Sequence, residues 1–267
     1  MSHDGAVRFV KAEANGNDFL IVDAEAVPHE QRSAFSRSIC DRHRGVGADG
    51  VEFVRPHGTG FELELRNSDG GEAEISGNGT RCVAAFYAKH GFREGVLHTG
   101  AGPLRATVLD GEGSHWLIEL EMGVPAIAGR ETITAEGRTW DATVLSVGNP
   151  QCVVMVPEFP ENWEAAGAAL ESHPRFPQGT NVEFVRVHNR HHLEVRIFER
   201  GVGPTSSSGT GSCAAAIAAI VAGAAGTPVE VTTPGGVQKV VWAGPGSAVR
   251  LVGPTSLVAE GMTWWRG

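Results

Sequence analysis

A short motif occurs twice in this chain, and it constrains the fold more than any other feature of the sequence. The first copy, Ser-Gly-Asn-Gly at residues 76–79, is followed by Cys82 and alanines, and the second, Ser-Gly-Thr-Gly at residues 208–211, is followed by Cys213 and alanines. In both copies a β-rich segment leads into the motif, and a helix of small residues follows it. A repeated strand, glycine turn and helix predict two lobes related by duplication.

Short β-rich segments dominate the rest of the sequence, and each half of the chain adds two helical patterns. The helices are expected at about 30–42, 79–89, 162–172 and 210–223. The strands are expected at 7–9, 19–22, 51–54, 61–65, 105–109, 116–121, 144–147, 153–156, 182–187, 193–198, 229–232, 237–242 and 248–251. Pro125 and small residues interrupt the strand pattern at 123–128, which predicts a first lobe over 1–124 and a second over 125–257. Residues 258–267 are a candidate for returning to the first lobe.

The composition excludes several classes of partner. A net charge of −9 and a pI near 5.7 argue against a surface that follows nucleic-acid phosphates, because such a surface needs clustered Lys and Arg. No apolar run approaches the roughly 20 residues of a membrane helix, and residues 1–5 lack the features of a signal peptide. We therefore expect a cytoplasmic protein whose partner is a small molecule and not nucleic acid or a membrane.

The cysteines and histidines predict no metal site. The four cysteines form neither a CxxC pair nor a close cluster with histidine, so neither zinc nor a disulfide framework is indicated. They are Cys40, Cys82, Cys152 and Cys213. His191 and His192 follow one another, and adjacent side chains on a strand point to opposite faces, which makes a poor chelate.

Each copy of the repeated motif can hold an anion. A glycine turn that opens a helix presents backbone N–H groups that lack partners within the helix, and the helix dipole adds partial positive charge there. If the two helix starts face one another, a carboxylate is held between the lobes with Ser76 on one side and Ser208 on the other. Two proton-transfer groups then flank one carbon, which is the geometry that inversion of a stereocentre requires.

Other interpretations of the motif do not fit the spacing. The sequence has no Walker A motif, and Ser-Gly-Asn-Gly-Thr lacks the spacing of a dinucleotide-binding turn. Gly-x-Ser-x-Gly does not occur around Ser76 or Ser208, so a serine-hydrolase elbow is not indicated.

Further segments, in both halves of the chain, carry a resemblance to a known family. In the first half they are Gly16–Phe19, Asp41–Asp49, Asn67–Gly70 and Gly77–Cys82. In the second half they are Gly148–Pro150, Gly179–Val182, Glu199–Gly203 and Gly209–Gly211. In these residues and their order the chain closely resembles the diaminopimelate epimerase family, over nearly its whole length.

The resemblance implies an α/β (α+β) fold of two pseudo-symmetric lobes, each a mostly antiparallel, β-barrel-like sheet around a central helix. It also implies a homodimeric, cofactor-independent enzyme in which two cysteines exchange the α-proton of LL- and meso-diaminopimelate, in lysine and peptidoglycan precursor synthesis. Those cysteines correspond in position to Ser76 and Ser208. The substrate-binding residues that the same match implies are Asn17, Asn67, Gly77, Asn78, Asn149, Asn181, Glu199, Arg200, Gly209 and Thr210.

Three departures from the family pattern bear on the chemistry. Both thiols are replaced by hydroxyls, which need a stronger base because a free cysteine already has a pKa near 8.5. Gln151 stands where the family usually has histidine, and glutamine cannot accept and pass on a proton. Pro204 replaces an acidic residue that commonly follows Arg-Gly-x-Gly. Glu199 is then the best candidate for a catalytic base, ahead of Asp69 and of loop carboxylates at 72 and 74.

Three functions fit these residues. The leading prediction is a diaminopimelate epimerase-like protein that interconverts the LL and meso forms. The second is an isomerase of another small acid on the same scaffold, with a single carboxylate as base. The third is a catalytically silent protein that keeps the substrate pocket. Ser76, Ser208 and Gln151 discriminate among them, because a two-base epimerase needs working acids and bases at such positions whereas a binding protein does not.

Overall fold

The computed structural model describes residues 5–265. Most of residues 1–5, for which the sequence predicts no signal peptide, therefore lies outside the described residues. The chain divides into two compact units. The first contains the residues up to 120 together with those from 253 onward, and the second contains residues 121–252. Each boundary therefore lies a few residues earlier than the sequence predicts.

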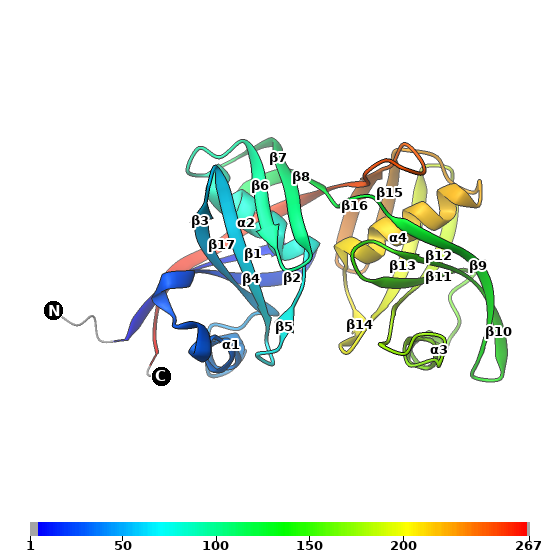
Figure 1. Cartoon of the computed structure of the whole chain (residues 1–267), viewed down its shortest axis with the longest axis horizontal. Helices are drawn as coiled ribbons and strands as arrows, with labels where there is room; N and C mark the ends of the chain where they lie inside the picture. The colour runs from blue at the N-terminus through cyan, green and yellow to red at the C-terminus, as the bar shows by residue number, and fades with distance from the viewer. Residues whose placement is uncertain (1–4, 266–267) are drawn as a thin grey trace. The chain divides into compact units, whose positions relative to one another are not determined.

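The first unit is a sheet that surrounds one helix (Figure 1). Its strands are β1 (Ala6–Ala14), β2 (Asn17–Asp23), β3 (Gly50–His57), β4 (Gly60–Asn67), β5 (Glu72–Ala73), β6 (Glu94–Thr99), β7 (Gly102–Glu112), β8 (His115–Glu121) and the second part of β17 (Arg250–Trp264). β17 pairs with β1, and the ladder continues through β2, β3, β4, β6 and β7. The helices are the short 3₁₀ turns η1 (Ala24–Ala26) and η2 (His29–Gln31), then α1 (Arg32–Cys40) and α2 (Gly77–Ala88).

The second unit repeats this plan with different residues. Its strands are β9 (Ala126–Ala135), β10 (Arg138–Ser146), β11 (Pro150–Met155), β12 (Asn181–Asn189), β13 (His192–Glu199), β14 (Gly203–Thr205), β15 (Val229–Thr233), β16 (Gly236–Val241) and the first part of β17. Its helices are α3 (Trp163–Glu171) and α4 (Gly209–Val221).

The two ladders alternate in the same way. In the first unit β1–β2, β3–β4 and β6–β7 are antiparallel, whereas β2–β3 and β4–β6 are parallel. In the second unit β10–β11, β12–β13 and β15–β16 are antiparallel, whereas β11–β12 and β13–β15 are parallel. This correspondence confirms the predicted fold class, two pseudo-symmetric lobes of mostly antiparallel, barrel-like sheet.

The helices that follow the repeated motif lie at the centre of each unit. Every residue of α4 from Gly209 to Ala219 is buried, and the helix contacts β10 to β13, β15 and β16. A helix that is apolar on all sides belongs in a core, and its alanines let the surrounding strands approach closely. α2 is buried in the same way and contacts β1, β2, β3 and β7. Within residues 5–265 no helix has both the length and the apolarity to cross a bilayer.

The elements differ from the sequence prediction at identifiable places. α2 and α4 begin before residues 79 and 210, the predicted starts, because the serine ahead of each helix caps it. The sequence prediction misses the short strands β5 and β14 as well as β6 and β9, and it stops β17 at residue 251. β9 pairs with β10, and every second side chain along it is exposed while most of the others are only half-buried. Its residues therefore lack the apolar alternation of a half-buried strand.

Candidate active site

Ser76 and Ser208 hold the same position in the two units, directly before the central helix. Ser76 is the N-cap of α2, and its Oγ accepts a hydrogen bond from the Gly79 N–H at 3.0 Å. Ser208 is the N-cap of α4, and its Oγ accepts from the Gly211 N–H at 3.2 Å. Both serines have the extended backbone of an N-cap and half-buried side chains. Each hydroxyl therefore stabilises a helix start, whatever chemistry it also performs.

The first unit positions Asn17 through a tight hairpin and one carboxylate. Asn15 and Gly16 join β1 to β2 with φ of 55° and 76°, the left-handed conformation that two-residue hairpin turns favour. The Asn17 Nδ2 donates to Asp49 at 2.6 Å, and the Asn17 Oδ1 accepts from the Asn78 Nδ2 at 3.3 Å. Because Asp49 takes the amide donor, the carbonyl oxygen of Asn17 is turned toward the start of α2.

An ion-pair cluster holds Asp49 in place. Arg42 donates to both Asp18 carboxylate oxygens and to Asp49, each at 2.8–3.1 Å, and Lys11 pairs with Asp18 at 2.9 Å. Burial raises the pKa of Asp18, but the hydrogen bonds from Arg42 and Lys11 outweigh burial and hold that pKa at about 2. Asp18 is therefore ionised at neutral pH, and the cluster ties β2 to the loop before β3.

The second unit connects its serine to Gln151 by a chain of neutral groups. The Gln151 Nε2 donates to the Asn149 Oδ1 at 2.5 Å, and the Asn149 Nδ2 donates to the Thr210 Oγ1 at 3.4 Å. The Thr210 hydroxyl lies 3.3 Å from the Ser208 hydroxyl. Gln151 thus occupies one end of a chain of hydrogen bonds that leads to Ser208, and no link of that chain titrates near neutral pH.

The remaining predicted residues lie at strand ends in the two units. The Asn181 Nδ2 donates to the Pro150 carbonyl at 3.2 Å, and the Asn181 Oδ1 accepts from the Arg200 backbone N–H at 2.9 Å. Glu199 ends β13 with a half-buried side chain, next to Arg200. Asn67 ends β4 opposite Gly50. The structure thus brings Asn149 and Thr210 together beside Ser208, and it places Asn181 and Arg200 next to Pro150, the neighbour of Asn149. In the first unit it brings Asn17 to Asn78, in the first turn after Ser76.

Comparison with known proteins identifies the family. The family model for diaminopimelate epimerase matches residues 9–128 and 143–258. The chain belongs to the diaminopimelate epimerase family. It is 36% identical to diaminopimelate epimerase 1 of Nostoc sp. strain PCC 7120 over 96% of this chain and 99% of that protein, and 38% identical to the diaminopimelate epimerase of Azoarcus sp. strain BH72 over 96% and 98%. These relatives support an epimerase-type enzyme. The fold also resembles a hydroxyproline epimerase of Agrobacterium vitis, with a TM-score of 0.72 at 16% identity over 97% and 91% of the two chains.

Sequence reasoning missed two buried glutamates of this epimerase-family chain. Glu52 and Glu183 are each at most 1% exposed, although the buried residues on either side of them in β3 and β12 are apolar. Burial raises the pKa of Glu52 to about 8. Burial, and then the charge of Glu199, raises the pKa of Glu183 well above its usual range. The signal was present in the sequence, because Val-Glu-Phe-Val-Arg occurs unchanged at 51–55 and at 182–186.

The other acids and thiols considered from the sequence have ordinary structural environments. Asp69, Glu72 and Glu74 are exposed, and Glu72 pairs with Arg66 at 2.6 Å. All four cysteines are buried without a disulfide within residues 5–265. Burial raises the pKa of Cys82, in α2, well above its usual range, so a reactive thiolate is not expected there.

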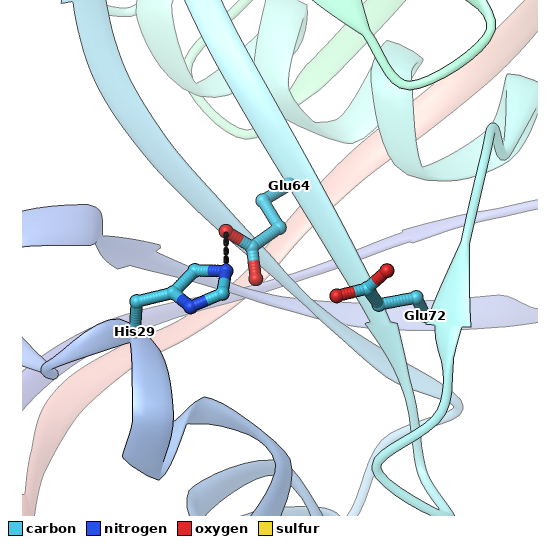
Figure 2. Close-up of side chains that lie close together, drawn as sticks. All are labelled: His29, Glu64 and Glu72. Atoms are coloured by element: carbon cyan, nitrogen blue, oxygen red, sulfur yellow. Dashed lines mark ion pairs between the residues drawn. The ribbon is translucent and has the colours of Figure 1, made fainter.

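One group of side chains has the composition of a metal site but already has cationic partners. Figure 2 shows His29, Glu64 and Glu72, whose potential ligand atoms lie within 4.8 Å of one another. Arg32 and Arg66 both pair with Glu64, and Arg66 also pairs with Glu72. Because two guanidinium groups neutralise the two carboxylates, we interpret this cluster as an ion-pair network that joins η2 and α1 to the sheet.

Proposed function

We propose that this chain binds diaminopimelate and interconverts its LL and meso forms by α-proton exchange without a cofactor. One observation carries the proposal. Each unit of this diaminopimelate epimerase family chain presents a half-buried hydroxyl at the start of its central helix, beside asparagine side chains suited to a polar substrate. Each unit therefore offers a similar set of groups for this reaction.

The proposed roles follow from chemistry at the two helix starts. Ser76 and Ser208 act on opposite sides of the α-carbon, where one removes a proton and the other returns one. The first turns of α2 and α4, at Gly77–Asn78 and Gly209–Thr210, bind the adjacent carboxylate through backbone N–H groups. Arg200 pairs with a substrate carboxylate and Glu199 with an ammonium group. The amides of Asn17, Asn67, Asn149 and Asn181 bind the remaining polar groups.

Turnover should be slow compared with that of a cysteine-dependent epimerase. A serine hydroxyl ionises far less readily than a thiol, and the polar chain that reaches Ser208 ends in Gln151 instead of a base. Loss of an efficient acid or base typically costs about 10²–10⁴ in rate. We therefore expect binding to be retained more fully than catalysis.

Calorimetry and heavy-water exchange test the proposal together. Titration with LL- and meso-diaminopimelate should show binding, and incubation in heavy water should place deuterium at the α-carbon. Exchange sensitively detects slow turnover because each event leaves a stable label. A chain that binds neither isomer would contradict the proposed substrate.

A silent substrate-binding protein is the second candidate. The observation that favours it is that the side-chain hydrogen bonds described for Ser76 and Ser208 go to backbone N–H groups and to Thr210, and not to a carboxylate or imidazole. Binding without deuterium uptake over days would support this candidate over the epimerase.

A further inference from the structure

The two buried glutamates occupy equivalent places in the duplicated fold. Glu52 lies on β3, which pairs in parallel with β2 and antiparallel with β4. Glu183 lies on β12, which pairs in parallel with β11 and antiparallel with β13. The repeated Val-Glu-Phe-Val-Arg segment therefore places one acid at the same point of each ladder.

Both glutamates point toward the central helix of their unit. Side chains alternate along a strand, and Phe53 and Phe184 belong to the apolar clusters around α1 and α3. The neighbouring Glu52 and Glu183 therefore face the opposite side, where α2 and α4 lie. A Cβ added at Gly79 would collide with the Glu52 Oε1, and one added at Gly211 would lie 2.9 Å from the Glu183 Oε1.

Each acid meets its serine at that same glycine. The Gly79 N–H donates to the Ser76 Oγ at 3.0 Å, and Glu52, Ser76 and Thr80 line one narrow void. In the second unit the Gly211 N–H donates to the Ser208 Oγ at 3.2 Å, and a Cβ at Gly211 would lie 3.3 Å from that Oγ as well as against Glu183. One residue thus touches both members of each acid and serine pair.

At least one carboxylate oxygen of each glutamate is left without a hydrogen-bond partner. Among residues 5–265, the Glu52 Oε1 and both oxygens of Glu183 are buried with no partner, as is the Thr80 hydroxyl beside Glu52. Buried polar atoms are almost always hydrogen-bonded, so such atoms need a functional explanation. The titratable groups that share these surroundings are Cys82 and Glu74 near Glu52, and Cys152 and Glu199 near Glu183.

We propose that Glu52 and Glu183 are the proton partners of Ser76 and Ser208, each acting on substrate through the serine at the start of the helix it faces. This inference rests on the proposed function and supplies the base that two hydroxyls need. The raised pKa of Glu52, about 8, keeps its proton exchangeable near neutral pH, which suits a general acid–base group.

The proposed proton transfers balance across the two faces. On one face, the ionised glutamate takes the serine Oγ proton while that Oγ takes the substrate α-proton, which leaves a carbanion. On the other face, a serine gives its proton to the carbanion and recovers one from its protonated glutamate. One glutamate gains a proton, the other loses one, and the stereocentre is inverted. A bridging hydroxyl such as Thr80, or a small side-chain rotation, completes the path.

Isotope exchange on the separate isomers tests the proposal. Glu52→Gln and Glu183→Gln keep the side-chain shape but cannot pass the proton, and Glu230→Gln, at the exposed position of β15, is the matched control. We expect each site variant to lose inversion by about 10²-fold or more, while α-deuterium uptake with retention persists on the unaltered face. One variant should therefore spare uptake into the LL isomer and the other uptake at the D centre of the meso isomer. A purely structural role would reduce both uptakes equally.

A second measurement needs neither a variant nor turnover. The infrared band of protonated carboxyl groups should persist in the unaltered chain at about pH 6, where ordinary glutamates with a pKa near 4.3 are ionised. Absence of that band would overturn the proposal, even if the glutamine variants fail to fold. If both site variants bind substrate and exchange its α-proton at parental rates, the inference about the glutamates is overturned and the proposed function stands. If the parent binds substrate without exchanging its α-proton, the inference about the glutamates is overturned as well. A chain that does not bind diaminopimelate would instead contradict the proposed function.

Discussion

At the scale of single residues, Ser76 and Ser208 serve two demands that favour different atoms. A helix N-cap favours a hydroxyl, which accepts the Gly79 or Gly211 N–H at about 3 Å. Proton abstraction favours a thiol, because a thiol ionises nearer to neutral pH. Serine satisfies the first demand at the expense of the second.

Restoring both thiols should therefore raise activity and lower stability. We expect Ser76→Cys with Ser208→Cys to increase α-proton exchange strongly, and either single change to achieve far less, because inversion needs an acid and a base on opposite faces. Each change should cost about 1 kcal/mol of stability through the weakened cap. Adding Gln151→His should raise the rate again, since this side chain begins the polar chain to Ser208. LL-to-meso conversion and urea unfolding would be measured for the parent chain, both single variants, the double variant and the triple variant. A double variant that binds substrate but exchanges the α-proton no faster than the parent would contradict this prediction.

Arg200 should contribute to affinity more than to the fold. Its backbone N–H is held by Asn181, so replacement of the side chain leaves that hydrogen bond in place. Hydrogen bonds to charged groups are worth about 1.5–3 kcal/mol, so Arg200→Ala should weaken diaminopimelate binding by roughly 10- to 100-fold. Calorimetry gives the change, with Arg190→Ala, an exposed arginine at the β12–β13 turn, as control. Equal affinity in the two variants would remove Arg200 from the site.

At the scale of elements, the sequence predicts what local chemistry specifies. The glycine turns before the alanine helices indicate α2 and α4, because Ser76 and Ser208 are good caps and the helices are apolar on every side. β9 is missed because tertiary pairing with β10, and not its own pattern, makes it a strand. The half-site residues around Asn17 and Asn149 are found by motif, but the part that Asp49 plays depends on a contact between residues 32 positions apart.

The glutamates of β3 and β12 should make stability depend on pH. The pKa of Glu52 is raised from 4.5 to about 8 in the folded chain, so its contribution is fully present below about pH 4.5 and is lost as pH rises through 8. This loss is up to about 5 kcal/mol, because one pKa unit corresponds to about 1.4 kcal/mol. Glu52→Gln should flatten the dependence of the unfolding free energy between about pH 5 and pH 8. Urea unfolding across this range measures the effect, and a parental slope in the variant would show that Glu52 ionises normally.

At the scale of the whole molecule, duplication has produced two half-sites with unlike supports. The first unit orients Asn17 through the charged cluster of Lys11, Asp18, Arg42 and Asp49. The second orients Asn149 through the neutral pair of Gln151 and Thr210. The pKa of Asp18 is lowered to about 2, so its contribution to stability is present above about pH 4 and lost as pH falls toward 2. Acid therefore weakens the first half-site before the second.

The outer face of β17 leads to the last prediction, the homodimer that the family resemblance implies. Met262 and Trp264 point to one face of the strand, where Trp264 is 80% exposed, and Val258 is exposed at the irregularity in the pairing of β17 with β1. A row of large apolar side chains on an exposed face is typical of a surface that a partner covers. We expect the chain to be a dimer at micromolar concentration, and Met262→Glu with Trp264→Glu to yield folded monomers, because each buried charge would oppose association. Val221→Glu, at the exposed end of α4, is the matched control and should remain dimeric. Light scattering on a sizing column gives the masses, and circular dichroism checks the fold. A monomeric parent, or a double variant that stays dimeric, would show that this face of β17 does not join two copies of the chain.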